Sequence, residues 1–166
     1  KGLDPVHRIS IVSRGMSLGH TLVPPAVDRV HETQSRLLSQ IAMMLGGRAA
    51  EELVFHEFTT GASNDIDKAS TLARDMVMEY GMSDLGPINY GPAQDVIDWG
   101  RGYMEPTQIS SDVQAKIDAE VKKIIDEAYK KAQAILKKYR KKMDAVVKSL
   151  MKVETMDGDE FAKMMA

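Results

Sequence analysis

The sequence predicts a mainly α-helical fold with a small N-terminal β-ribbon and a long helical C-terminal part. Aromatic residues make up only 5% of the 166 residues while methionine occurs twelve times, a composition typical of helix-rich, aliphatic proteins. β-branched residues gather in a possible strand only near the N-terminus. Apolar residues from 112 to 152 recur every 11 residues, about 3.67 per turn, which is close to a straight helix.

Residues 1–24 are expected to hold the β-ribbon, with a hairpin over 6–23. Pro5 disfavours a helical start, and the β-branched residues Ile9, Ile11 and Val12 follow it. A turn between Gly15 and Gly19 leads to a short return strand, which comprises Thr21, Leu22 and Val23.

Residues 28–81 are expected to form helices. Asp28 or Thr33 can cap the first helix, whose apolar residues recur at helical spacing up to Leu45. The pair Gly46-Gly47 either kinks this helix, separates it from a second one, or lets another helix approach closely. After a loop over 57–64, Ser63 or Asn64 can cap a further helix, which ends before Gly81.

Residues 82–109 are rich in glycine and proline and predict a long irregular loop, of the kind that is normally functional. Residues 110–166 are expected to form long C-terminal helices. The repeat over 112–152 fits one very long helix or two collinear helices, and we expect residues 154–160 to turn the chain into a short terminal helix. The predicted layers are the ribbon with three shorter helices, followed by these long helices.

Composition excludes several classes of function. The chain has no cysteine, which rules out disulfides, thiolate zinc sites and a cysteine nucleophile. The net charge of −2 gives no general reason to expect nucleic-acid binding. The charges of the basic run at 137–142 are mixed with the apolar positions Tyr139 and Met143, and no aromatic stacking platform accompanies them, so a solvated helix face is favoured over a nucleic-acid or lipid contact. The length suits one domain over residues 1–166, since domains hold about 100–150 residues most often.

Few residues are candidates for chemistry by spacing alone. Asp65 lies in the first turn of a helix, where a carboxylate can bind a metal, although stabilisation of the helix dipole is the commoner role. The four histidines form no His-Glu-x-x-His pair, and each is expected to be a surface or packing histidine and not a ligand. Glu51 and Glu52 are adjacent on a helix and do not converge, so a solvated helix edge is favoured for them.

Several collinear blocks resemble the FtsH-type ATP-dependent zinc metalloproteases. They are Asp4-Pro-Val-His-Arg-Ile-Ser-Ile, Leu45-Gly-Gly-Arg-Ala-Ala-Glu-Glu-Leu-Val-Phe, Phe58-Thr-Thr-Gly-Ala-Ser-Asn-Asp-Ile, Tyr80-Gly-Met-Ser-Asp-Leu-Gly-Pro and Glu154-Thr-Met-Asp-Gly. The resemblance extends from about residue 4 to residue 162. It implies a helical peptidase domain within a membrane-anchored homo-hexamer, soluble itself and facing the cytoplasm or its equivalent.

The resemblance also implies cofactors, partners and site residues. Zinc is held by two histidines of a His-Glu-x-x-His helix and by the aspartate of the Gly-Ala-Ser-Asn-Asp block, which is Asp65 here. An AAA+ ATPase domain of the same chain, using ATP and magnesium, delivers polypeptide substrates. The strand formed by Ile9, Ser10, Ile11, Val12 and Ser13 is a candidate edge strand for pairing with the substrate. No nucleic-acid partner is expected.

The family's His-Glu-x-x-His helix lies shortly before the Asp-Pro-Val-His segment, which begins here at Asp4. We therefore expect no catalytic residue among these 166, the general-base glutamate to lie upstream, and the isolated chain to be inactive. The alternative is a peptidase-dead homologue, or a helical oligomerisation module of the same ring.

Overall fold

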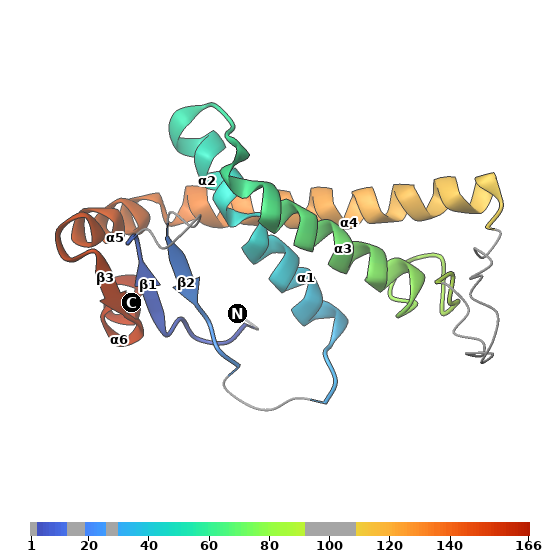
Figure 1. Ribbon diagram of the computed structural model, residues 1–166, viewed down its shortest axis with the longest axis horizontal. Coiled ribbons are helices and arrows are strands. Elements are labelled where there is room, and N and C mark those ends of the chain that lie inside the picture. The colour runs from blue at the N-terminus through green and yellow to red at the C-terminus, as the bar shows by residue number, and fades with distance from the viewer. Residues whose placement is uncertain (1–2, 13–18, 26–29, 92–108) are drawn as a thin grey trace, which may run out of the picture.

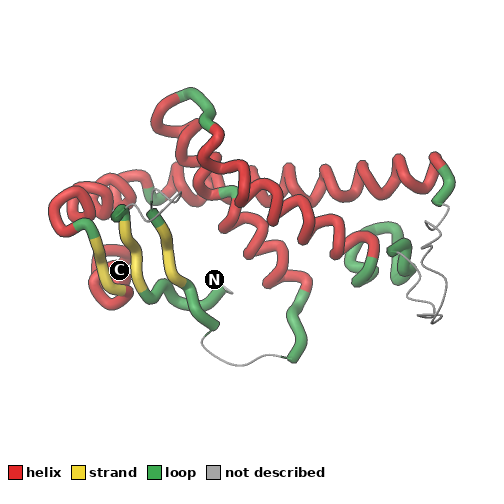
Figure 2. The backbone as a smooth tube through the Cα atoms, in the orientation of Figure 1, coloured by secondary structure: helices red, strands yellow, loops and turns green. Residues whose placement is uncertain are grey.

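A computed structural model describes residues 3–12, 19–25, 30–91 and 109–166. These residues form six α-helices, one short 3-10 helix and a three-stranded sheet (Figures 1 and 2). The mainly α-helical fold with a small β-ribbon is therefore confirmed. Within the described ranges, no helix combines the length and the apolar character that crossing a membrane requires.

The sheet joins the two ends of the chain. Strand β1 (Arg8–Ser10) pairs antiparallel with β2 (His20–Leu22), which confirms the predicted hairpin. On its other side β1 pairs antiparallel with β3 (Thr155–Asp157), and Ile9 lies opposite the buried Met156. We expected a turn at β3, because a three-residue strand with a single apolar residue leaves almost no alternating pattern in the sequence.

The predicted substrate strand does not lie at an edge of the sheet, so this prediction is wrong for Ile9, Ser10, Ile11 and Val12. The strand order is β2-β1-β3, and the N–H of Ile11 donates to the carbonyl of Glu154 at 3.0 Å. Because both sides of β1 are occupied, an extended peptide has no free main-chain edge there. Ser13 lies outside the described residues.

Two helices follow where the sequence predicted a helical run with a break. Helix α1 (Gln34–Met44) begins after the N-cap residue Thr33, whereas Asp28 lies outside the described residues. Helix α2 (Gly46–Phe55) begins directly after Leu45, so the glycine pair opens a second helix. A Cβ atom at Gly46 or Gly47 would meet nothing within 4 Å, and a close helix approach is therefore not the reason for this pair.

The 3-10 helix η1 (Thr60–Ala62) leads directly into α3 (Ser63–Met78). Neither Ser63 nor Asn64 caps α3 as predicted. Its N-cap residue is Ala62, and the polar cap has moved to Thr59 at the start of η1. The extra turn of 3-10 helix explains the shift, because it places the first free N–H groups three residues earlier.

Gly81 lies just after α3 with a φ of +59°, which agrees with its predicted role at the helix end. A Cβ atom there would lie 2.8 Å from Cα of Pro87, so the chain turns back too tightly for any other residue. The returning segment is held by a hydrogen bond of 2.7 Å from the N–H of Tyr90 to the carbonyl of Met78. Of the predicted loop 82–109, residues 92–108 lie outside the described residues.

The C-terminal part contains α4 (Ser111–Lys138), α5 (Arg140–Val153) and α6 (Gly158–Met165). The repeat over 112–152 therefore corresponds to two helices. They meet at Tyr139, whose ψ of 20° departs from the helical value of about −42°.

Two apolar clusters hold these elements together. The larger lies between α1, α3 and α4, where Ile41, Met76 and Ile117 are fully buried. The smaller joins the sheet to α5 and α6 through Leu150 and Met156. The ribbon thus packs against the C-terminal helices and not against the three shorter helices as expected; Figure 1 shows the sheet beside α5 and α6.

Candidate functional site

The candidate metal ligand Asp65 lies in the first turn of α3 and is exposed. Across the described part of the chain, no side chain or backbone group forms a hydrogen bond or an ion pair with its carboxylate. The helix N-terminus favours a negative charge at this position. Asp65 therefore presents an ionisable oxygen ligand that the surrounding fold leaves uncommitted.

Asp65 fits a metal ion as one donor of a larger set. The described residues contain no group of three His, Cys, Asp or Glu side chains that could hold a metal ion together. A catalytic zinc ion usually takes three protein ligands, and carboxylate oxygen is an accepted ligand type. The described residues thus supply one suitable zinc ligand and do not complete the ligand set by themselves.

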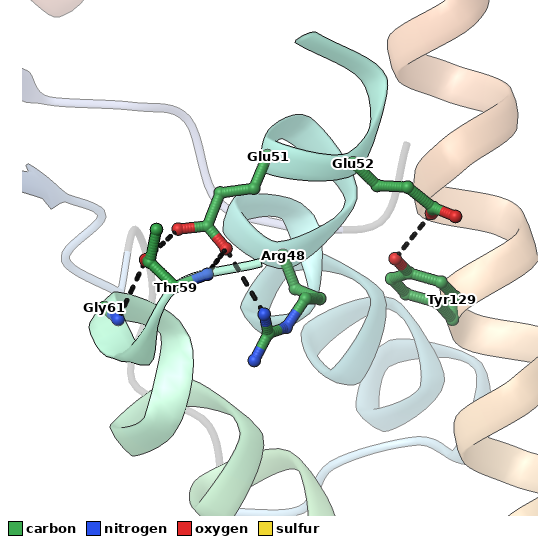
Figure 3. Close-up of polar contacts among 6 residues, drawn as sticks. All are labelled: Arg48, Glu51, Glu52, Thr59, Gly61 and Tyr129. Atoms are coloured by element: carbon green, nitrogen blue, oxygen red, sulfur yellow. Dashed lines mark hydrogen bonds and ion pairs between the residues drawn. The ribbon is translucent and has the colours of Figure 1, made fainter. Parts of the chain in front are cut away.

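Glu51 of α2 fastens the loop that leads to Asp65. Its Oε1 accepts a hydrogen bond of 2.5 Å from the hydroxyl of Thr59, and its Oε2 accepts one of 3.4 Å from the Thr59 N–H. The Thr59 hydroxyl oxygen in turn accepts from the N–H of Gly61 at 3.1 Å (Figure 3). The hydrogen bond from the Thr59 hydroxyl lowers the pKa of Glu51 below its ordinary value of 4.5. The carboxylate therefore stays ionised and holds the loop from one point.

Arg48 of α2 contacts both Glu51 and the same loop. Its Nη1 lies 3.4 Å from Oε2 of Glu51, in a pair whose side chains are only 22% and 19% exposed. Its guanidinium carbon lies 4.7 Å above the centre of the Phe58 ring, at cation–π distance. Arg48 and Glu51, on one turn of α2, thus contact two consecutive residues of the loop, Phe58 and Thr59.

Glu52 of α2 faces the opposite way and attaches α2 to α4. Its Oε2 accepts a hydrogen bond of 2.7 Å from the hydroxyl of Tyr129 (Figure 3). The same oxygen accepts one of 2.5 Å from Nε2 of Gln133. The two hydrogen bonds lower the pKa of Glu52. Burial, followed by the bond to the Glu52 carboxylate, raises the pKa of Tyr129 to about 12. Over a wide pH range Glu52 therefore stays ionised and Tyr129 stays protonated, as the hydrogen bond between them requires.

The prediction that Glu51 and Glu52 do not converge is confirmed, because one faces the η1 loop and the other faces α4. The expectation of a solvated helix edge is wrong. Both side chains are partly buried, and each carries hydrogen bonds to a different element. The role of Thr59 was also missed in the sequence. The contact joins a helical residue to a residue outside that helix, so no single periodicity could have indicated it.

The chain was compared with protein families and with curated proteins. The model of Peptidase family M41 matches residues 1–164. The ATP-dependent zinc metalloprotease FtsH of Pseudothermotoga lettingae is 48% identical over 164 residues, which are 98% of this chain and 26% of that protein. The protein of the same name from Thermotoga maritima is 43% identical over 165 residues, which are 98% of this chain and 27% of that protein.

A third relative, the ATP-dependent zinc metalloprotease FtsH 1 of Sphaerobacter thermophilus, is 47% identical over 158 residues. These residues cover 95% of this chain and 24% of the relative. The chain thus spans about a quarter of the length of the curated relatives that it matches. With the family model matched almost from end to end, the chain belongs to Peptidase family M41, a family of metalloproteases.

Proposed function

We propose that the chain is the larger part of the proteolytic domain of an ATP-dependent zinc endopeptidase that degrades unfolded or membrane polypeptides. The observation that carries this proposal is the uncommitted carboxylate of Asp65, at the start of a helix whose preceding loop is held from α2. Membership of Peptidase family M41 and the names of the relatives as zinc metalloproteases support the same chemistry.

In this proposal Asp65 is one zinc ligand. The two histidine ligands and the general-base glutamate come from residues of the full-length protein outside these 166. Zinc, when bound, polarises the scissile carbonyl and lowers the pKa of its bound water toward about 7. This chain contributes the orientation of the carboxylate ligand. The described residues supply no second and third ligand nearby, which supports a site completed by another segment.

The proposal extends to the assembly. The full-length protein is a membrane-anchored homo-hexamer, in which an AAA+ ATPase domain of the same chain uses ATP and magnesium to deliver polypeptides to the peptidase ring. We expect this domain to be soluble and to face the cytoplasm or its equivalent, without a nucleic-acid partner. The relatives named as ATP-dependent proteases, of which this chain covers about a quarter, support an additional ATPase part.

A second candidate function is a helical oligomerisation module of the same ring, with or without peptidase activity. Large apolar side chains lie exposed at intervals of four or eight residues along α4 and α5, namely Ile135 (48% exposed), Tyr139 (36%), Val147 (51%) and Met151 (72%). Such a stripe is typical of a face that another helix covers. Light scattering on the 166-residue chain tests this candidate. A strict monomer at high concentration would exclude autonomous assembly, whereas a discrete oligomer would support it.

The proposed activity is tested with the full-length protein on an unfolded casein substrate in the presence of ATP and zinc. We expect cleavage that stops when a chelator removes zinc and returns when zinc is added back. Asp65→Ala should abolish cleavage, whereas the matched control Asp67→Ala, which changes an exposed carboxylate on the same helix, should retain it. Unchanged cleavage by Asp65→Ala would overturn the assignment of this ligand.

A further inference from the structure

Glu51 and Thr59 form the connection between α2 and the loop before the candidate ligand. Among the described residues, neither belongs to a group of three acidic, histidine or cysteine side chains that could hold a metal ion with Asp65. We propose that Glu51 is a positioning residue for Asp65, acting through the hydroxyl of Thr59. The inference deepens the proposed function and rests on it, because it requires Asp65 to be a metal ligand.

The polar contacts of Glu51 either connect it to the loop or lie within its own helix. Its carboxylate bonds to the hydroxyl and the N–H of Thr59 and lies beside Arg48. At 19% side-chain exposure, this carboxylate is shielded from most of the solvent. Charge-assisted hydrogen bonds of this kind are about twice as strong as bonds between neutral groups. The position of Thr59 relative to α2 is therefore closely defined.

Thr59 controls the next turn of the chain. Its hydroxyl oxygen accepts a hydrogen bond from the N–H of Gly61 and so caps η1. A Cβ atom at Gly61 would lie 3.2 Å from Oγ1 of Thr59 and 3.8 Å from Oε1 of Glu51, so the backbone passes directly over this pair. The orientation of η1 thus depends on the same hydroxyl that Glu51 holds.

The chain leads from η1 to Asp65 without a flexible joint. The N–H of Ser63 donates to the carbonyl of Thr60, and α3 begins at Ser63 itself. Ala62, between the two helices, is buried. Asp65 is the third residue of α3, so its carboxylate inherits the orientation that the Thr59 cap gives to η1.

Helix α2, which carries Glu51, is itself attached to α4. The neighbouring Glu52 connects α2 to α4 through Tyr129 (Figure 3) and through Gln133. Adjacent residues on one helix turn thus serve two different connections, one to the main body of helices and one to the loop. A ligand that must keep its orientation within about 0.5 Å benefits from such support. Partners outside the ligand set typically change metal affinity by about 10- to 100-fold when removed.

The test measures the zinc affinity of the full-length protein by competition with a chelator, and the visible absorption spectrum after replacement of zinc by Co²⁺. Thr59→Val, which keeps the shape of the side chain and removes the hydroxyl, should weaken zinc binding by about 10-fold or more and shift the Co²⁺ bands. Thr59→Ser restores a hydroxyl and should restore both readouts. The matched control Thr60→Val changes a neighbouring side chain of η1 that forms no hydrogen bond among the described residues, and it should leave both readouts unchanged.

Glu51→Ala should weaken zinc binding by a factor similar to that of Thr59→Val, and the double variant should be no weaker than either single one. If Glu51→Ala does not fold, the comparison of Thr59→Val with Thr59→Ser decides the question alone. Unchanged zinc affinity and an unchanged Co²⁺ spectrum in Thr59→Val overturn the positioning role. If Asp65→Ala loses zinc while Thr59→Val keeps it, the proposed function stands and only this inference fails. If Asp65→Ala keeps its zinc affinity, the proposed function fails as well.

Discussion

The hydroxyl of Tyr129 donates a hydrogen bond of 2.7 Å to Oε2 of Glu52, which joins α4 to α2 across 77 residues of sequence. The adjacent Glu51 holds Thr59 at 2.5 Å on the other side of α2. Because these two carboxylates point away from each other, α2 connects the long helix α4 to the loop before Asp65. The physical account of the candidate site depends on this pair of connections.

The bond between Tyr129 and Glu52 is tested by Tyr129→Phe. This change removes the donor and keeps the ring, and Gln133 still serves the carboxylate. We expect a loss of about 1 kcal/mol in the free energy of unfolding, measured by urea denaturation, since one hydrogen bond to a charged group is lost near the surface. The control Tyr80→Phe changes a half-exposed tyrosine whose hydroxyl forms no hydrogen bond among the described residues, and it should have little effect. Equal effects of both changes would contradict the account.

The raised pKa of Tyr129 predicts a specific alkaline behaviour. Tyr129 in the unfolded chain ionises near pH 10, whereas in the folded chain its pKa is about 12. Unfolding between these values releases a proton, so the contribution of Tyr129 to stability is complete below pH 10 and declines as the pH rises toward 12. Absorbance titration of the five tyrosines should reveal one late component, and Tyr129→Phe should remove it. A wild-type titration without that component would be inconsistent with the bond.

The lowered pKa of Glu52 predicts the opposite behaviour in acid. Its folded pKa lies below the ordinary value of 4.5, so the unfolded chain takes up a proton first as the pH falls. The contribution of Glu52 to stability is therefore present above pH 4.5 and is lost as the pH falls through the folded pKa. Glu52→Gln should flatten the decline of the midpoint of thermal unfolding over this range. The prediction fails if the wild type and the variant decline in parallel.

Gly158, the first residue of α6 directly after β3, tests the junction of the two chain ends. A Cβ atom there would lie 2.0 Å from the carbonyl oxygen of Val6, so the backbone must move to accommodate alanine. We expect Gly158→Ala to destabilise the fold by about 1–3 kcal/mol in chemical denaturation. The matched change Gly47→Ala meets no atom within 4 Å and lies in a helix, so it should stabilise by about 0.5 kcal/mol. A neutral Gly158→Ala would contradict the close approach of β3 to the N-terminal segment.

Much of the fold follows from local patterns in the sequence. Helical spacing indicated α1, α3 and the long C-terminal helices, and the β-branched residues around Ile9 indicated the hairpin. Strand β3 could not be found in this way, because its assignment depends on pairing with a strand almost 150 residues away. The edge position of Ile9 was wrong for the same reason. The exposure of Ile135 and Val147 in the 11-residue repeat could not be predicted either. Periodicity identifies the apolar face of a helix and does not show whether another element covers it.

The candidate site could be predicted only in part. Spacing placed Asp65 in the first turn of a helix, which the structure confirms, and the resemblance to a family suggested its role as a ligand. The support of its loop by Glu51 and Thr59 arises from a tertiary contact between two helical turns and a 3-10 cap. Such a contact depends on how α2 and η1 pack, and sequence periodicity carries no information about it.

The most direct test of the account is the zinc content of the purified full-length protein, measured by elemental analysis in the wild type, Asp65→Ala and Asp67→Ala. The account predicts one zinc ion per chain in the wild type and in Asp67→Ala, and loss of bound zinc in Asp65→Ala. An Asp65→Ala variant that stays folded and retains one tightly bound zinc ion per chain would contradict the central claim.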